Sequence, residues 1–292
     1  MIEPSIGIAL GSTFCRIGDV AYNLGQIADF AEQARRAGSH ILLTPELSVT
    51  GYGPYAEVVA LAEIPGEGAV YEGLAKIAKR SGVAIAAGFV EKHGHGPGIS
   101  HYVVMPGGGF HVQRKYRVTP FEFPLVPVLE SLTPGEQVPE KLSFDVLDFP
   151  VFEIQGLKCV MVICADAGIE NLQGYFDMLG VQVVFAPVGA GGDVKDRVRT
   201  SDLETAEGRA KYLGALEKAY WPPARGIFDC ITHRRALACI NQTGWDDRKC
   251  AHIGDGNIVT PRGEIPVMLC GVPNLDFQRP AFGAGSIPLS HF

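Results

Sequence analysis

One stretch, residues 157–166, constrains this chain most because it combines a buried strand with a reactive side chain. Residues 159–163 form a short apolar run with β-branched side chains, which predicts a buried strand. The run ends at Cys164, and Gly168 follows shortly afterwards. A cysteine at such a turn can face a cleft, where backbone N–H groups can point at an oxyanion. The alternative is a structural thiol, since free cysteines are among the most buried residues.

The overall composition is that of a globular protein. The chain has 292 residues, of which 47% are hydrophobic and 20% are charged, which fits one large α/β domain or two small ones. A net charge of −7 argues against general nucleic-acid binding. No apolar run reaches the roughly 18 residues expected of a membrane span, and the first residues lack the basic start of a signal peptide. We therefore expect neither nucleic acid nor membrane as a partner.

The cysteines and histidines show no ligand pattern. There are seven cysteines, an odd number without the spacing of a disulfide framework or a zinc site. His93 and His95 lie in a glycine-rich stretch without a third ligand, so a solvated turn is the simpler interpretation. We expect no metal and no cofactor, and we expect a reducing, cytoplasmic location.

The N-terminal part alternates between strand and helix patterns. Residues 5–10 look like a strand, Asp19 can cap a helix that extends to about residue 34, and residues 40–43 look like a second buried strand. This is the crossover unit of an α/β sheet. Glu46 follows the second strand, where it is either a capping or solvated carboxylate or a partly desolvated general base at the rim of the sheet.

The later segments predict further strands and one irregular region. The sequence has no internal repeat and no linker, so we expect one domain, residues 1–270, with residues 271–292 as a C-terminal arm of the same domain. Residues 189–226 are the least sheet-like part, and their role stays open. The expected elements are a loop at 92–100, a hairpin of 101–105 with 110–115, strands at 181–185 and 235–240, and a helix at 203–220.

Three expected strand ends carry Glu46, Lys115 and Cys164, in this order. This order resembles the nitrilase, or carbon–nitrogen hydrolase, superfamily, whose triad is Glu, Lys and Cys. The resemblance covers roughly residues 5–270. The segments that carry it are Thr44-Pro45-Glu46 with Gly51-Tyr52, Gln113-Arg114-Lys115 with Thr119-Pro120-Phe121-Glu122, and Ile163-Cys164-Ala165-Asp166, together with Asn241 to Gly244 and Gly254 to Gly263.

The resemblance implies a fold and an assembly. The expected fold is α/β, a four-layer α-β-β-α sandwich of the nitrilase type with two sheets face to face. The expected assembly is a homodimer or a larger homo-oligomer. An arm rich in proline and glycine has little core of its own, so we expect residues 273–292 to cross onto a partner.

The resemblance also implies the chemistry of the site. Cys164 is the expected nucleophile, Glu46 the base and Lys115 the stabiliser of the oxyanion, because a thiolate attacks a carbonyl carbon far better than a thiol does. A thioester at Cys164 would form and then be hydrolysed. The residues expected to bind or orient the substrate are Glu122, Tyr52, Ala165 and Asp166, with the backbone N–H of Ala165 as an oxyanion donor and Asp166 as a supporting turn residue.

The residues after the nucleophile distinguish the branches of the superfamily. Nitrilases tend to carry Trp-Glu there, whereas Ala165-Asp166 looks like the amidase and carbamoylase branches. Residues 167–168 offer no arginine of the kind that carbamoylases use for a substrate carboxylate. We therefore expect an amidase-like enzyme that cleaves a small linear amide, with a nitrile or an N-carbamoyl compound as the alternative substrate.

Two other classes of function stay open. Residues 169–171 lack the aromatic-Pro-Glu that the family usually carries, and residues 189–226 match the family poorly. A non-catalytic binding protein that keeps the fold would fit these departures. A Cys–His hydrolase would need a histidine beside Cys164, for which His233 and His252 are the candidates.

Overall fold

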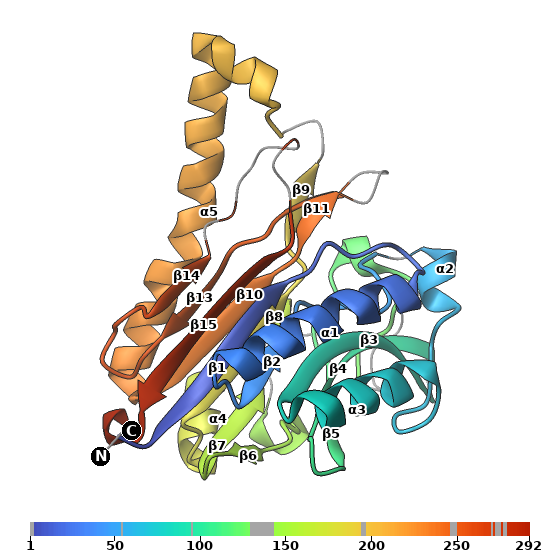
Figure 1. Cartoon of the computed structure of the whole chain (residues 1–292), viewed down its shortest axis with the longest axis vertical. Helices are drawn as coiled ribbons and strands as arrows, with labels where there is room; N and C mark the ends of the chain where they lie inside the picture. Colours follow the sequence, from blue (N-terminus) through green and yellow to red (C-terminus); the bar gives the residue numbers. More distant parts are fainter. Residues whose placement is uncertain are drawn as a thin grey trace.

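The chain is described by a computed structural model over residues 3–53, 55–94, 96–128, 143–193, 197–245, 250–269, 271, 276 and 279–292. Two six-stranded sheets form its centre (Figure 1). In spatial order, the first sheet consists of β15 (Ala281–Pro288), β1 (Ser5–Ser12), β2 (Ile41–Leu43), β3 (Ala84–His93), β4 (Gly96–Val104) and β5 (Phe110–Arg114). The second consists of β14 (Val267–Leu269), β13 (Gly256–Val259), β10 (Ala236–Asn241), β8 (Val183–Val188), β7 (Leu157–Met161) and β6 (Phe152–Ile154). A small third sheet has the order β11 (Thr243–Trp245), β12 (Cys250–Ile253) and β9 (Gly191–Asp193).

Helices cover the outer faces of the two large sheets. The first sheet carries α1 (Val20–Arg36) and α3 (Ala69–Ser81), and the second carries α4 (Leu172–Leu179) and α5 (Ala206–His233). A short helix, α2 (Ala56–Val59), lies in the connection from β2 to α3. The end of α5 nearest its first residue extends well beyond the sheets in Figure 1.

Three clusters of buried side chains correspond to the three interfaces between these layers. Both sheets contribute to the central cluster, which includes Ile8 and Leu43 of the first sheet and Met161 and Phe185 of the second. A second cluster joins the first sheet to α1 and α3, and a third joins the second sheet to α4. This arrangement confirms the expected α-β-β-α sandwich.

Local sequence explains the first crossover. The Asp19 carboxylate accepts a hydrogen bond from the backbone N–H of Tyr22 at 3.0 Å, so it caps α1 as expected. The buried residues of α1, which include Ile27 and Ala34, repeat at helical spacing against the sheet. β1, β2 and β3 pair in parallel, as do β7, β8 and β10. Parallel strands place their carboxyl ends at one edge, where α/β proteins position their sites.

Several expected elements differ in extent. Residues 92–100 form no long loop, because β3 extends to His93 and β4 begins at Gly96. Pro187 does not end β8, which continues to Val188, and the helix expected at 203–220 begins at Ala206 and runs to His233. For β3, β4 and β8, strand pairing overrides a local preference for a turn or a break.

The C-terminal segment also differs from its expectation. Residues 281–288 form β15, which pairs antiparallel with β1 of the same chain from Ser5↔Pro288 to Ser12↔Ala281. This part of the expected arm therefore forms an edge strand of the first sheet of its own chain. The two ends of the chain lie close together as a result (Figure 1). Among the helices that the structure describes, none has both the length and the apolar content needed to cross a membrane.

Candidate active site

Three strand ends bring Glu46, Lys115 and Cys164 to one place. Glu46 follows β2, Lys115 directly follows β5 and Cys164 follows β7, so the first two come from one sheet and the third from the other. The ammonium Nζ of Lys115 donates to Glu46 Oε1 at 2.6 Å and to Glu122 Oε1 at 2.7 Å. The charges of Glu46 and Lys115 both act on the pKa of the Cys164 thiol. The structure thus assembles the three residues that the sequence placed at separate strand ends.

Two left-handed backbone conformations occur at the site, one at Cys164 and one at Leu47, beside Glu46. Cys164 has a φ of 47° and begins a short 3-10 turn, Cys164–Gly168, while Leu47, next to Glu46, has a φ of 52°. Such left-handed conformations are uncommon outside glycine, and they persist where the surroundings determine them. The turn at Leu47 packs onto Gly88 of β3, where an added Cβ would lie 2.2 Å from the Leu47 nitrogen.

Burial sets the protonation states of this cluster. Desolvation raises the pKa of Glu46 to about 7, because it outweighs the opposing attraction of Lys115, and the neighbouring Glu122 raises this pKa further. Burial disfavours the charged form of Lys115, but Glu46 and Glu122 outweigh it and raise the pKa of Lys115 above its ordinary value. Burial and the Glu46 charge raise the pKa of Cys164. Cys164 therefore rests as a thiol beside a carboxylate that can accept a proton near neutral pH.

Glu122 joins Lys115 to Tyr52, because it accepts hydrogen bonds from both side chains. The Tyr52 hydroxyl donates to Glu122 Oε1 at 2.6 Å, and Glu122 Oε2 accepts from the Thr119 backbone N–H at 2.7 Å. The Tyr52 ring stacks on Phe121 with a centroid separation of 5.9 Å. Burial, and then the charges of Glu46 and Glu122, raise the pKa of Tyr52 far above its ordinary value, so its hydroxyl stays a donor.

Asp166 and Ala165 occupy the turn that follows the thiol. The Asp166 carboxylate is buried, and it accepts hydrogen bonds from the backbone N–H groups of Tyr116, at 3.1 Å, and Arg117, at 2.7 Å. It therefore joins the turn after Cys164 to the backbone that follows Lys115. Ala165 is half-buried in the same turn.

Three further residues contact the site but were not among the site residues expected from the sequence. Gly189 follows β8, and a Cβ there would lie 2.3 Å from Tyr52 Cε2 and 2.9 Å from Glu46 Oε2. A hydrogen bond from its backbone N–H also lowers the pKa of Cys164, against the larger effect of burial. Gln242 donates from Nε2 to the backbone carbonyl of Glu46 at 2.7 Å, and Asn241 donates from Nδ2 to the carbonyl of Ala190 at 2.9 Å. The Asn-Gln pair was visible as a motif, but its partners are distant in sequence.

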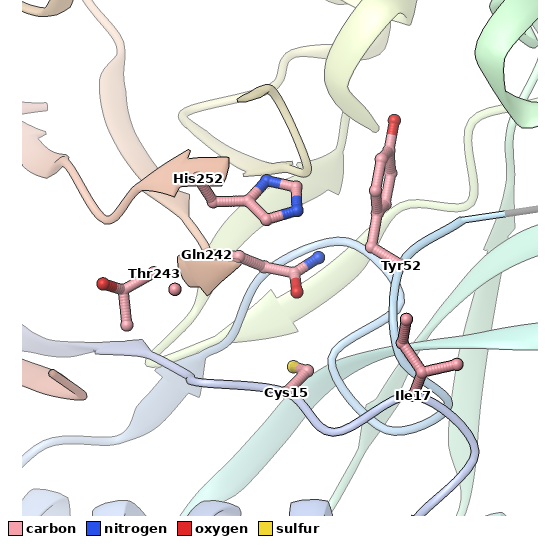
Figure 2. Close-up of a pocket in the computed structure, with 7 residues that line it drawn as sticks. Cys15, Ile17, Tyr52, Gln242, Thr243 and His252 are labelled. Atoms are coloured by element: carbon pink, nitrogen blue, oxygen red, sulfur yellow. The ribbon is translucent and has the colours of Figure 1, made fainter. Parts of the chain in front are cut away.

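A small pocket lies beside Tyr52 (Figure 2). Tyr52, Gln242 and His252 converge on it, and Cys15 and Ile17 close it from the first sheet's side. Its volume is about 10 Å³, which is the space of about one water molecule. Its full lining is Cys15, Ile17, Tyr52, Gln242, Thr243, Gly244 and His252.

The histidine alternatives have other contacts. His233 lies at the end of α5, where its Nδ1 is 3.0 Å from a carboxylate oxygen of Asp177. His252 packs edge-on against Tyr52 at 5.3 Å between ring centroids, and its Nδ1 is 3.2 Å from the carbonyl of Ala190. His95 lies outside the described residues. Within those residues there is no group of three or more His, Cys, Asp or Glu side chains that could hold a metal ion.

Comparison with known proteins gives one family. The carbon–nitrogen hydrolase family model matches residues 7–228. A probable nitrilase of Schizosaccharomyces pombe is 23% identical over 256 residues, which cover 86% of this chain and 79% of that protein. The crystal structure of an amidase from Nesterenkonia sp. aligns with a TM-score of 0.71 and 22% identity, over 99% of this chain and 92% of the amidase.

A second structure of that amidase contains a ligand. It is a variant of the Nesterenkonia sp. enzyme in complex with butyramide, and it aligns with a TM-score of 0.70 and 22% identity, over 100% of this chain and 95% of the amidase. At this identity the structural likeness shows the fold, and the family match over most of the chain shows the class of protein. The chain therefore belongs to the carbon–nitrogen hydrolase family, and it is an enzyme of that family.

Proposed function

We propose that this enzyme hydrolyses a small linear amide through a thioester at Cys164. The observation that carries the proposal is the buried contact of Lys115 with Glu46 and Glu122, at 2.6 and 2.7 Å, beside the Cys164 thiol. A buried thiol whose pKa is raised needs a base, and Glu46, with a pKa of about 7, can serve as one.

In the first half-reaction the C–N bond is exchanged for a C–S bond. Glu46 takes the proton of the Cys164 thiol, and the thiolate attacks the carbonyl carbon of the amide. The ammonium of Lys115 and the backbone N–H of Ala165 stabilise the resulting oxyanion. Glu46 then gives its proton to the leaving nitrogen, so ammonia departs and an acyl thioester remains.

In the second half-reaction water replaces the sulfur. Glu46 takes a proton from water, and the hydroxide attacks the thioester carbonyl carbon, with the same two donors facing the oxyanion. The C–S bond breaks, the carboxylic acid leaves and Glu46 returns the proton to the sulfur. Glu122 and Tyr52 keep Lys115 in place, because the Tyr52 hydroxyl and the Lys115 ammonium both donate to Glu122 Oε1.

Two observations support an amide in preference to a nitrile. Ala165-Asp166 stands after the nucleophile, and a structurally similar amidase takes up butyramide. The similarity to a probable nitrilase supports a nitrile as the alternative substrate, and an N-carbamoyl compound is the other alternative.

The test is ammonia release from butyramide, butyronitrile and an N-carbamoyl amino acid. We expect release from butyramide, and we expect its loss in Cys164→Ala and Cys164→Ser with the fold retained. Cys159→Ala is the matched control, because Cys159 is a buried thiol in the middle of β7, the strand that precedes Cys164, and burial raises its pKa to about 12. Faster release from butyronitrile would favour the nitrile alternative. An acyl adduct that mapped to Cys15 or Cys159 would contradict the assignment of the nucleophile.

The location and assembly of the enzyme also remain proposals. We propose a cytoplasmic enzyme that forms a homodimer or a larger homo-oligomer and does not bind nucleic acid. The net charge of −7 and the resemblance to the family support this proposal. A monomer in sedimentation at micromolar concentration would contradict the assembly.

A further inference from the structure

We propose that Gln242 is a positioning residue, which fixes the catalytic base Glu46 relative to the loop that contacts the Cys164 thiol. This inference rests on the proposed function and adds to it a residue that touches neither the substrate nor the reacting sulfur. Three observations support it: a hydrogen bond between the two sheets, a second hydrogen bond to the loop after β8 that contacts the thiol, and the small number of hydrogen bonds that otherwise hold the Glu46 carboxylate.

The first support is the contact between Gln242 and Glu46. Gln242 follows β10 in the second sheet, while Glu46 follows β2 in the first. The Gln242 side chain is buried, and its Nε2 donates to the Glu46 backbone carbonyl at 2.7 Å, across 196 positions of sequence. In Figure 2 the Gln242 side chain extends between the two sides of the pocket toward Tyr52 and Ile17. One short hydrogen bond thus joins the base to the opposite sheet.

The second support is the residue before Gln242. Asn241 Oδ1 accepts from the Gln242 backbone N–H at 2.8 Å, and Asn241 Nδ2 donates to the Ala190 carbonyl at 2.9 Å. Ala190 follows Gly189, whose backbone N–H bonds to the Cys164 thiol and which packs against Glu46 Oε2. The Asn241-Gln242 pair therefore contacts the backbone of the base on one side and the loop beside the nucleophile on the other.

The third support is how few contacts hold the Glu46 carboxylate. Lys115 binds Oε1, whereas Oε2 is buried and has no partner in good hydrogen-bond geometry within the described part of the chain, although the Cys164 thiol is near enough to lower the pKa of Glu46. An oxygen of this kind can accept the proton of the thiol, and no hydrogen bond among the described residues fixes its direction. Since a displacement of about 1 Å can cost roughly 10²-fold in rate, a hydrogen bond at the Glu46 backbone has a direct effect on the reaction.

The experiment uses two substitutions that keep the size of the side chain. Gln242→Met keeps the length and removes the donor, so we expect kcat for butyramide to fall about 10- to 100-fold with little change in KM. Iodoacetamide labelling of Cys164, mapped by mass spectrometry, should slow to a similar degree near neutral pH, because the base is misplaced. This readout does not depend on turnover, and a purely structural role would not change it.

Gln242→Glu tests the hydrogen bond to the Glu46 carbonyl with a single variant, because a change of pH alone adds or removes the donor. Only the protonated form of the introduced carboxyl group can donate to the Glu46 carbonyl, and the ionised form repels it. We therefore expect Cys164 labelling and kcat, each relative to the parent enzyme, to be highest at low pH and to decline as pH rises. This comparison remains available if Gln242→Met does not fold.

Gln26→Met is the matched control, since Gln26 Nε2 donates to the Phe14 carbonyl at 2.7 Å, away from the triad. We expect it to change stability without changing the rate of Cys164 labelling. The inference is overturned if folded Gln242→Met keeps kcat and labelling within two-fold of the parent, if Gln26→Met slows labelling equally, or if Gln242→Glu shows no pH dependence of its own. A parent enzyme that releases no ammonia while its labelling still responds to Gln242 would refute the proposed function alone.

Discussion

At the scale of single residues, the site depends on one cation between two buried carboxylates. Because burial raises the pKa of Glu46 to about 7, a substantial fraction of this group is protonated near neutral pH. Only the ionised form can take the Cys164 proton, so we predict that kcat/KM rises as pH increases through about 7. The pKa of Lys115 is raised above its ordinary value, so Lys115 stays charged throughout this range. Measurement of kcat/KM from about pH 5 to about pH 9 checks this prediction.

Glu46→Gln is the control for this pH dependence. The variant has no titrating base, so the rise near pH 7 should disappear, and any thioester that forms at Cys164 should accumulate. A rise that persisted in Glu46→Gln would assign the pH dependence to another group, and Asp166, whose pKa burial raises to about 7, is the candidate beside the site.

A second prediction concerns Lys115. Lys115→Met removes the cation between Glu46 and Glu122, so we expect kcat to fall by about 10²–10³-fold, the scale of one oxyanion donor. Removal of one partner from a buried ion pair also costs about 3–5 kcal/mol of folding stability. Lys158→Met is the control, because Lys158 is exposed and donates to the Leu179 carbonyl. Equal losses of kcat in the two variants would contradict the role of Lys115.

At the scale of elements, the sequence predicted the strands and helices whose positions follow from the local pattern of apolar residues. Apolar runs located the strands that precede Glu46, Lys115 and Cys164, and their order along the chain indicated the site. The contacts of Gly189 and Gln242 could not be predicted this way, because they join segments that are distant in sequence and meet only after the sheets pack. The prediction of a loop at 92–100 was wrong because it considered local sequence only. Pairing between β3 and β4 extends both strands through glycines that locally favour a turn.

The turn after Cys164 gives a prediction about how elements are joined. Asp166→Ala leaves the backbone N–H groups of Tyr116 and Arg117 without their acceptor, at a cost of about 1–3 kcal/mol for each buried group. Because Lys115 directly precedes Tyr116, we also expect a lower kcat. Thermal unfolding and steady-state kinetics measure the two effects, and Asp145→Ala, at an exposed carboxylate in a surface turn, is the control. Unchanged stability in Asp166→Ala would show that the turn is held by other contacts.

At the scale of the whole molecule, β15 joins the two sheets. It pairs with β1 in the first sheet, and it also packs on β14 of the second. Its composition, rich in glycine, indicated an arm without a core of its own, but the same glycines permit this close contact. A Cβ at Gly283 would lie 2.7 Å from Val267 Cγ1 and 3.1 Å from Leu269 Cδ2. The small side chains that weaken a strand prediction are thus the ones that the packing of the sheets requires.

This packing predicts the effect of a larger residue at position 283. Gly283→Val places a branched side chain against Val267 and Leu269, and overpacking of this kind costs about 1–3 kcal/mol. Gly25→Ala is the control, because an added Cβ at Gly25 in α1 meets nothing within 4 Å and alanine favours a helix over glycine by about 1 kcal/mol. Chemical denaturation should therefore show a lower unfolding midpoint for Gly283→Val and an equal or higher one for Gly25→Ala. If Gly283→Val were as stable as the parent, β15 would not be held against β14, and the strand would be free to serve the contact between subunits that the sequence indicated.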